Sequence, residues 1–251
     1  DDLPAAPGVY IFHGDSETLP LYIGKSVNIR NRVLSHLRNE EEARLLRQTR
    51  RISHIRTAGE VGALLLEASL IKQQQPLYNQ KLRRTKQLCS WLLTDHGAQI
   101  VYSQDVNFAI QKGLYGLFSS KRAALEAMRV LADQSRLCYG VIGLEKLIPN
   151  KPCFRYMLQQ CAGACCGHED HAAHHARLKS SLQSIQVKCW PYPGAIALVE
   201  RFNDEVQMHV IAQWCYLGSV HDPKEAAALV RQATGFDADG YKILCRPILG
   251  G

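Results

Sequence analysis

Short apolar runs and amphipathic stretches alternate through the first third of the chain. Residues 9–12 and 21–23 are apolar and rich in strand-forming side chains, and residues 13–16 between them have the composition of a hairpin turn. The pattern therefore predicts an antiparallel pair of strands. In residues 28–38 the apolar side chains recur every four positions, which predicts a helix with one buried stripe.

Three further elements complete this part of the chain. Residues 40–50 predict a polar helix, residues 52–57 predict a third strand, and residues 60–74 predict the most apolar helix, which ends before Pro76. The order β-β-α-α-β-α indicates an α+β fold, in which a small mixed or antiparallel sheet packs against helices. We assign residues 1–86 to this first domain.

The middle of the chain shows weaker periodicity. We expect a strand at 115–118, a capped helix over 119–134 and a long polar helix over 168–188. Cysteines crowd between the two predicted helices. We therefore expect residues 87–190 to form a helical region around a cysteine-ligated metal.

The last segment, residues 191–251, predicts a small α+β region. The sequence Pro-Tyr-Pro-Gly at its start breaks the preceding helix. The expected elements are strands at 195–202, 206–214 and 241–245 and a helix over 223–232.

The distribution of charge narrows the range of partners. The chain has 251 residues, 46% of them hydrophobic, and a formal net charge of +7. Residues 1–90 hold 14 Lys and Arg against 9 Asp and Glu, whereas residues 91–251 hold 16 against 14, so the basic character lies at the start. A polyanionic partner is favoured. Because no run could cross a membrane and no signal peptide opens the chain, we expect a soluble, cytoplasmic protein; the absence of a starting methionine predicts trimmed termini.

A row of polar side chains borders the buried stripe of the first predicted helix. Asn28, Arg32 and His36 are four residues apart and can face a cleft, although a solvated helix edge would show the same pattern. Glu67 is more informative because its neighbours one turn away are all apolar. A buried carboxylate is costly unless a cation compensates it. The candidates are Arg32, Lys25 and a divalent metal ion, and an isolated structural salt bridge is the alternative.

These residues follow an order and spacing that resemble the GIY-YIG nuclease domain. The resemblance is closest to the N-terminal half of the UvrC excision-repair nucleases and, within that family, to their short homologues of the Cho type. It extends from residue 3 to residue 84, and its motifs are highly specific in combination. They are Gly8-Val9-Tyr10, Tyr22-Ile23-Gly24-Lys25-Ser26, Arg32, His36, Glu67 and Pro76-Leu77-Tyr78-Asn79.

The resemblance implies metal-dependent hydrolysis of one DNA phosphodiester bond. It implies that Glu67 anchors a single Mg²⁺ or Mn²⁺, which acts as a Lewis acid, and that Arg32 holds the scissile phosphate in bidentate fashion. Tyr22 would deprotonate the attacking water, with Tyr10 as a supporting hydrogen-bond partner. Because a free phenol has a pKa of about 10, this role requires positive charge nearby. Half-buried strand aromatics are the alternative for both tyrosines.

Other positions have subsidiary roles in the same resemblance. Lys25 would add positive charge, His36 occupies a position where the family often has tyrosine, and Asn79 would fix the geometry of the cleft. Basic side chains around the cleft would contact the DNA backbone without reading its sequence, and a solvated surface position is the alternative for each. They are Arg44, Arg47, Arg50, Arg51, Lys81, Arg83, Arg84 and Lys86.

Nine cysteines, an odd number, argue against a disulfide framework. Cys138, Cys153, Cys161 and Cys165 are separated by intervals of fifteen, eight and four, and Cys166 is an alternative fourth ligand. The last two intervals resemble the [4Fe-4S] ligand pattern in the middle of UvrC, which implies an iron-sulfur cluster. Four thiolates suit tetrahedral zinc as well, so zinc stays open. We interpret the histidines at 168, 171, 174 and 175 as a solvated helix face.

The last third of the chain lacks the signature of a second nuclease. Its aspartates are predicted at turns or helix caps, and we expect no acidic residue inside an apolar strand, whereas the RNase H-type site of UvrC requires several converging acids. One site predicts one incision. The resemblance then implies a cut on the 3′ side of a lesion in damaged double-stranded DNA, in nucleotide excision repair and the SOS response, with recruitment by UvrB. The alternatives are a structure-selective nuclease independent of UvrB and a DNA-binding module without catalysis.

Overall fold

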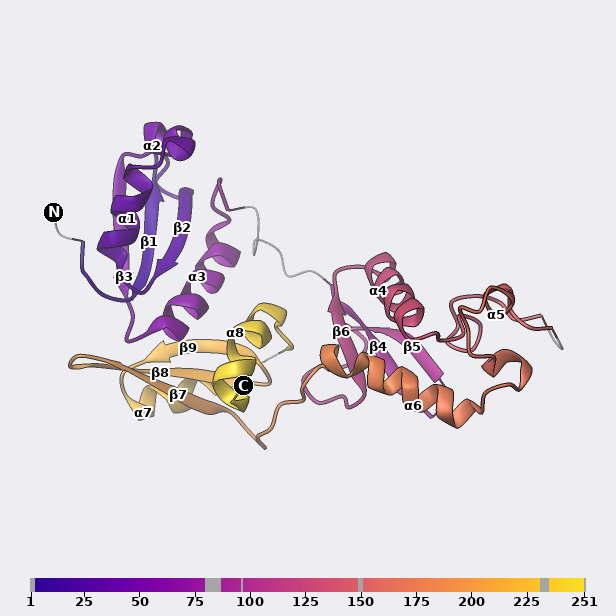
Figure 1. Ribbon diagram of the computed structural model, residues 1–251. Coiled ribbons are helices and arrows are strands. Elements are labelled where there is room, and N and C mark those ends of the chain that lie inside the picture. The colour runs from indigo at the N-terminus through magenta and orange to yellow at the C-terminus, as the bar shows by residue number, and fades with distance from the viewer. Residues whose placement is uncertain (1–2, 80–86, 96, 149–150, 231–234, 251) are drawn as a thin grey trace. The chain divides into compact units, whose positions relative to one another are not determined.

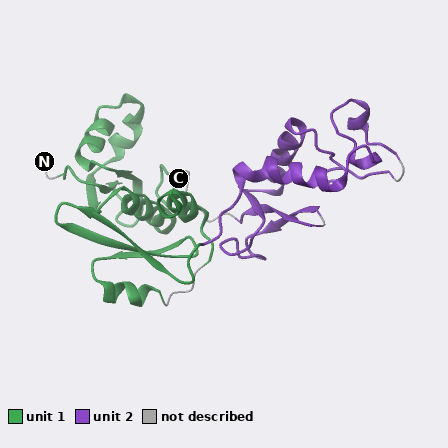
Figure 2. Ribbon diagram, turned by 60° about the horizontal axis from the view of Figure 1, so that its bottom comes forward, with its two compact units in different colours: residues 1–85, 191–251 green, residues 86–190 purple. Residues whose placement is uncertain are grey.

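The computed structural model describes residues 3–79, 87–95, 97–148, 151–230 and 235–250 (Figure 1). The chain divides into two compact units (Figure 2): residues 1–85 with 191–251 form unit 1, and residues 86–190 form unit 2. Among the described residues, three small antiparallel sheets with packed helices confirm the α+β class. In these parts of the chain every helix falls short of the length and apolarity that a membrane span requires.

The first sheet of unit 1 confirms the predicted order of elements. These are β1 (Gly8–His13), β2 (Pro20–Ser26), α1 (Ile29–Leu37), the short 3-10 helix η1 (Glu40–Glu42), α2 (Ala43–Gln48), β3 (Arg51–Arg56) and α3 (Glu60–Gln74). The strand order is β2-β1-β3, so β1 is central. Its side chains alternate between two buried faces, because Val9 and Ile11 pack with Ile71 of α3 while Tyr10 and Phe12 face α1 and α2.

A second sheet, of order β7-β8-β9, completes unit 1 with two helices. Its elements are β7 (Ile196–Phe202), β8 (Glu205–Ala212), β9 (Cys215–Val220), α7 (Pro223–Leu229) and α8 (Ala238–Leu249). The sequence analysis missed β9. The strand that it predicted at 241–245 is wrong, because this segment lies inside α8. Asp237 caps that helix by accepting hydrogen bonds from the amides of Asp239 and Gly240. Gly240 and Leu244, one turn apart, are buried.

Unit 2 contains a sheet that the sequence analysis did not predict. Its elements are β4 (Cys89–Thr94), β5 (Gly97–Tyr102), β6 (Leu114–Phe118), α4 (Lys121–Gln134), α5 (Phe154–Met157), η2 (Ala164–Cys166), α6 (His171–Leu182) and η3 (Gln183–Ile185). The expectation of a helical region is therefore wrong for β4 and β5, whose short apolar runs carry no clear period of two. The long helix expected over 168–188 is shorter, and Met128 of α4 and Leu178 of α6 share the core of the sheet.

Candidate active site and cysteine cluster

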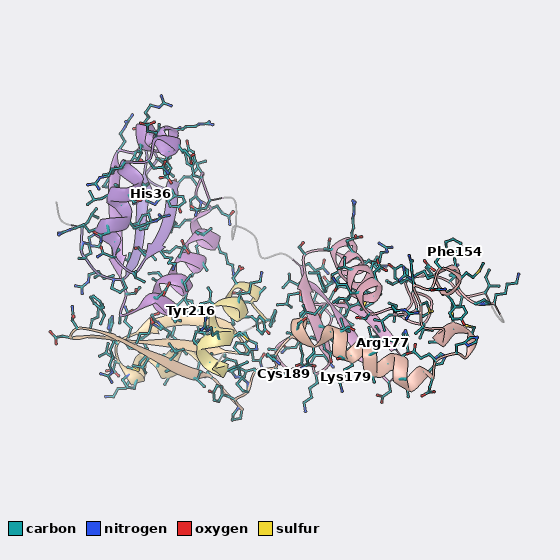
Figure 3. All side chains as sticks on the ribbon, in the orientation of Figure 1. His36, Phe154, Arg177, Lys179, Cys189 and Tyr216 are labelled. Atoms are coloured by element: carbon teal, nitrogen blue, oxygen red, sulfur yellow. The ribbon has the colours of Figure 1, made fainter. Side chains whose placement is uncertain are left out.

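Three aromatic rings meet on the α1 side of the first sheet, and one of them belongs to His36, which Figure 3 labels. Tyr10 of β1, Tyr22 of β2 and His36 of α1 have ring centroids 5.3 to 6.2 Å apart. Tyr10 is 1% exposed, and its hydroxyl oxygen lies 2.7 Å from Nε2 of His36. The hairpin and the following helix thus bring together three of the predicted site residues.

The strand that carries Tyr22 is fixed at the neighbouring positions. Asn79 donates a hydrogen bond from Nδ2 to the Ile23 carbonyl and accepts one at Oδ1 from the Ile23 amide, both at 2.9 Å. Gly24 lies opposite Tyr10 in the β1–β2 register. A Cβ at position 24 would overlap the Tyr10 hydroxyl and approach the ring of Tyr22. The glycine is therefore required by the packing of the tyrosine pair.

Glu42 is a site residue that the sequence analysis missed. Its carboxylate accepts a hydrogen bond from Nδ1 of His36, which is 4% exposed. Because a carboxylate only accepts, Nδ1 of His36 carries a proton, and Nε2 is the nitrogen that faces the Tyr10 hydroxyl. In the sequence nothing distinguishes Glu42 from Glu40 and Glu41, since all three read as solvated acids after a helix.

Arg32 lies one turn before His36 on α1 and interacts with both phenols. Burial raises the pKa of Tyr10 and of Tyr22, and the negative charge of Glu67 raises the pKa of Tyr22 further. The positive charge of Arg32 acts in the opposite direction but does not prevail. In the protein alone both phenols are therefore neutral at pH 7, and Tyr22 can act as a base only when a further cation is present.

Glu67 of α3 faces the end of β2. Its Oε1 accepts a hydrogen bond from the Lys25 amide at 3.0 Å, whereas the Lys25 ammonium pairs with Glu60 at 2.6 Å. Burial raises the pKa of Glu67, and the Lys25 amide and charge only partly oppose this shift. None of the ion pairs between described residues includes Glu67. Neither Arg32 nor Lys25 therefore forms an ion pair with this carboxylate, and it can serve a divalent cation.

Half of the basic residues expected to contact DNA lie in the described chain. Arg44 and Arg47 on α2, Arg50 just before β3 and Arg51 at the start of β3 are exposed. Arg50 pairs with Asp15 at 2.9 Å across the surface. The other four, Lys81, Arg83, Arg84 and Lys86, lie outside the described residues.

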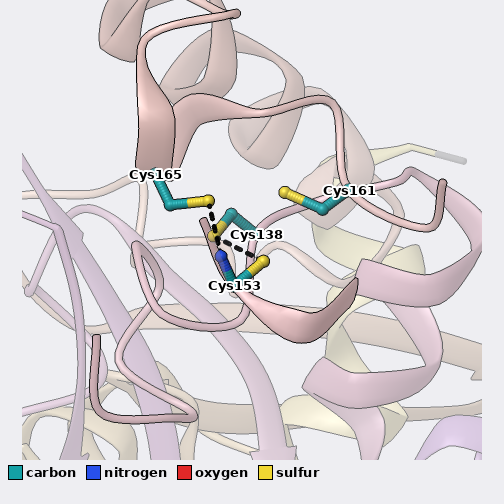
Figure 4. Close-up of side chains that lie close together, drawn as sticks. All are labelled: Cys138, Cys153, Cys161 and Cys165. Atoms are coloured by element: carbon teal, nitrogen blue, oxygen red, sulfur yellow. Dashed lines mark hydrogen bonds between the residues drawn. The ribbon is translucent and has the colours of Figure 1, made fainter. Parts of the chain in front are cut away.

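Four cysteines of unit 2 come from the segment between α4 and α6, and their side chains converge (Figure 4). The sulfur atoms of Cys138, Cys153, Cys161 and Cys165 all lie within 4.8 Å of one another, and the first three residues are buried. Cys166 is not in this group, and its sulfur instead donates to the Gly163 carbonyl. All nine cysteines lie in the described chain, and none forms a disulfide.

Hydrogen bonds hold the side chains of the cluster at defined positions, whereas burial opposes the ionisation of Cys138 and Cys161. Burial raises the pKa of the Cys138 and Cys161 thiols, so an ion that held them would have to supply compensating charge. The amide of Cys153 donates to the Cys165 sulfur at 3.4 Å. His174 of α6 is buried and accepts a hydrogen bond from the Cys138 amide at 3.0 Å, so the interpretation of this histidine as solvated was wrong. Its spacing of four from Leu178 was the available signal.

The acidic residues of the last third do not converge on a second metal site. Glu200 lies inside β7, which contradicts the expectation that no acid sits in an apolar strand, but it pairs with His209. Asp222 caps α7, and Asp237 caps α8 and pairs with Lys72. Within the described chain, the cysteine cluster is the one group of three or more metal-ligating side chains close enough to share an ion.

Three family models match successive parts of the chain. They are the UvrC-like GIY-YIG domain over residues 6–80, the UvrC/Cho excinuclease middle domain over residues 88–184, and the excinuclease Cho C-terminal domain over residues 195–251. The fold and the site thus define a GIY-YIG endonuclease of DNA repair.

Curated relatives narrow this class further. Excinuclease Cho of Escherichia coli K12 is 56% identical over 251 residues, which cover all of this chain and 85% of that protein. Excinuclease Cho of Salmonella typhimurium LT2 is 56% identical over 250 residues, which cover all of this chain and 85% of that protein. The chain belongs to the excinuclease Cho family.

More distant likenesses cover parts of the chain. UvrABC system protein C of Petrotoga mobilis is 32% identical over 184 residues, which cover 69% of this chain and 31% of that protein. The GIY-YIG N-terminal endonuclease domain of UvrC from Thermotoga maritima, solved with its catalytic magnesium, is 38% identical. The match covers 31% of this chain and 88% of that one, with a TM-score of 0.29.

Proposed function

We propose that this endonuclease makes a single metal-dependent incision on the 3′ side of a lesion in UvrB-bound DNA. The observation that carries the proposal is that Tyr10, Tyr22 and Arg32 lie together on the α1 side of the first sheet, while Glu67 reaches the end of β2 from α3 and acts electrostatically on Tyr22. The family shown by the comparisons supports excision repair as the setting. The scattered acids of the last third support one incision rather than two, and the substrate together with nine free cysteines supports a cytoplasmic location.

Glu67 fits the role of a metal ligand. It is a partly buried carboxylate, held by the Lys25 amide and without an ion pair among the described residues. Bound there, Mg²⁺ or Mn²⁺ would act as a Lewis acid on the scissile phosphate. The hydrogen bond from the Lys25 amide fixes Oε1 of Glu67. The other carboxylate oxygen is then available to bind the metal ion. The Lys25–Glu60 pair keeps the ammonium of Lys25 at the rim of the site.

The phenols and the guanidinium divide the remaining tasks. Tyr22 takes the proton of the attacking water, and Tyr10, held by His36, orients its neighbour. Arg32 interacts electrostatically with both phenols, and its guanidinium would hold the phosphate oxygens in bidentate fashion. Because burial and Glu67 raise the pKa of Tyr22, its activity as a base depends on a cation at Glu67. Asn79 keeps the strand that carries Tyr22 in place.

The exposed arginines of α2 and the start of β3 support contact with the phosphate backbone. Each lies on the surface of the same domain as the aromatic cluster. Contacts of this kind neutralise phosphates and make affinity fall with salt, without sequence preference. The four basic residues 81, 83, 84 and 86 would extend the same interface.

For the cysteine cluster we propose a resident metal, with a [4Fe-4S] cluster as the first candidate. The interval pattern it shares with UvrC supports that choice. The distances between the sulfur atoms support the alternative of zinc. Zinc–sulfur bonds of about 2.3 Å give a tetrahedron whose sulfur–sulfur edges are about 3.8 Å long, and the sulfur atoms of Cys138 and Cys153 lie 3.9 Å apart. Metal analysis and the visible absorption spectrum of anaerobically purified protein separate the two.

The test is nicking of a duplex with one defined lesion, in the presence of Mg²⁺, with and without UvrB. We expect a single cut 3′ to the lesion that requires UvrB and is abolished by Glu67→Gln while DNA binding persists. Glu41→Gln is the matched control, because Glu41 is an exposed carboxylate of η1 outside the site, and its loss should change the rate less than about 5-fold.

Each other outcome identifies a different function. Cutting of branched or lesion-free DNA without UvrB would show a structure-selective nuclease. Binding without cutting by the native chain would show a DNA-binding module. Equal cutting by the native chain and Glu67→Gln would remove Glu67 from the site.

A further inference from the structure

Helix α3, which carries Glu67, begins without a capping side chain of its own. Its N-cap position is Gly59, and the first-turn amides of a helix need acceptors from elsewhere. Glu200 of β7 supplies them, because its Oε1 accepts from the Val61 amide at 3.0 Å and its Oε2 accepts from the Gly62 amide at 2.7 Å. The carboxylate thus comes from a strand almost 140 residues away in sequence, in the sheet that meets the start of α3 (Figure 1).

A buried network holds Glu200 in this position. His209 of β8 donates from Nε2 to Oε2 of Glu200 at 2.9 Å, and its Nδ1 lies 2.6 Å from the Ser219 hydroxyl. That hydroxyl lies 2.6 Å from the hydroxyl of Tyr216, labelled in Figure 3. The side chain of His209 has no exposed surface. Burial opposes the charge of Glu200, yet the hydrogen bonds from His209 and the two amides hold its pKa below the ordinary value.

Two glycines of α3 admit this network. A Cβ at Gly62 would lie 2.5 Å from Cε1 and 2.8 Å from Nε2 of His209, and a Cβ at Gly59 would overlap the carboxylate of Glu200. Glycine inside a helix is unfavourable on propensity alone. The sequence Gly-Glu-Val-Gly is therefore explained by the close approach of the C-terminal sheet.

The same C-terminal segment also fastens the other end of α3. Lys72, in the last turn, pairs with Asp237 at 2.7 Å and with Asp239 at 3.0 Å, both at the start of α8. Glu67 lies between Val61 and Lys72, so the two attachments flank it along the helix. A carboxylate at the N-terminus also has the sign that the helix dipole favours.

We propose that Glu200, oriented by His209, is a positioning residue of the nuclease: it caps α3 from the C-terminal region and thereby places Glu67 at the end of β2. This gives the region 195–251 a task in catalysis, although it contributes no group to the reacting atoms. The link to catalysis rests on the metal-binding role proposed above for Glu67. The cap and the placement of Glu67 are independent of that role.

The test follows amide hydrogen exchange in the full chain without added divalent metal. In Glu200→Ala we expect the amides of Val61 and Gly62 to exchange at least about 5-fold faster than in the native protein. The Lys25 amide, which donates to Glu67, should lose protection with them. Glu205→Gln is the matched control, because Glu205 is also on this sheet and its carboxylate pairs at 3.2 Å with Arg56 of β3.

Further variants keep the outcomes distinct. Glu200→Gln preserves the shape of the side chain but offers one acceptor oxygen, so it should expose one of the two amides, and it replaces Glu200→Ala if the latter does not fold. Unchanged exchange at Val61 and Gly62 in both variants would overturn the cap. Faster exchange there with full protection of Lys25 would overturn the placement of Glu67.

A second readout addresses the metal. Titration with Mn²⁺ should show weaker binding in Glu200→Ala by about the factor seen at the Lys25 amide, and no binding in Glu67→Gln. If Glu67→Gln bound Mn²⁺ normally, the metal role of Glu67 would fail, while the exchange data would still decide the cap.

Discussion

The contact between Glu42 and His36 allows a prediction whose size follows from burial. In Glu42→Ala the Nδ1–H of His36 loses its acceptor inside a site where the imidazole is 4% exposed. An unsatisfied buried donor costs about 1 to 3 kcal/mol, and we expect the unfolding free energy to fall by that amount. Equilibrium unfolding in urea measures this loss directly.

The same change should slow the chemical step. Without Glu42 either nitrogen of His36 can carry the proton, so the bond that fixes the Tyr10 hydroxyl through Nε2 is no longer enforced. We expect the single-turnover nicking rate to fall about 10-fold, equivalent to about 1.4 kcal/mol. Glu42→Gln should restore most of both losses, since its amide oxygen can still accept from Nδ1.

Glu41→Ala is the control for general effects of charge. Glu41 is the adjacent, exposed acid of η1, and its removal should change stability by less than about 0.5 kcal/mol. The reasoning is refuted if Glu41→Ala and Glu42→Ala behave alike in both assays, or if Glu42→Gln is as impaired as Glu42→Ala.

Three further predictions follow from the buried charges and the cysteines. Because burial raises the pKa of Glu67, its charged form destabilises the metal-free fold. Glu67→Gln should therefore raise the unfolding free energy at pH 7. Urea titrations should show this gain vanish as the pH falls below 4.5, the ordinary pKa of glutamate. For Glu200 the pKa shift has the opposite sign, because its pKa in the folded protein lies below the ordinary 4.5. The stability lost in Glu200→Ala should therefore be greatest above pH 4.5 and disappear as the pH falls through the folded pKa. A loss that does not depend on pH would contradict this. Cys161→Ser should lose the resident metal while Cys166→Ser keeps it, as judged by metal analysis, and equal metal content would show that the four-cysteine assignment is wrong.

Much of the first domain was predictable because its signals are local. Strands β1 and β2, helices α1 and α3 and their order follow from apolar periodicity and turn residues within short windows. Elements that depend on distant partners were missed. Segment 241–245 is apolar enough for a strand, but the cap by Asp237 and the burial of Gly240 and Leu244 make it part of α8.

The candidate site divides in the same way. The sequence by itself identified the candidates for the chemistry, since Tyr10, Tyr22, Arg32 and Glu67 stand in a recognisable order. Their supports were visible in it only in part, because Asn79 was among the predicted residues and Glu42 was not. In the sequence Glu42 is one of three adjacent acids. Only the folded chain shows that η1 brings its carboxylate to His36.

Tertiary structure alone decided how α3 is held and what its glycines are for. Glu200 reaches the start of the helix from another sheet, and only the folded chain shows that Gly59 and Gly62 make room for it and for His209. The physical reason is that capping and close packing depend on positions in space. Residues that meet across so many intervening positions share no period or motif from which their contact could be inferred.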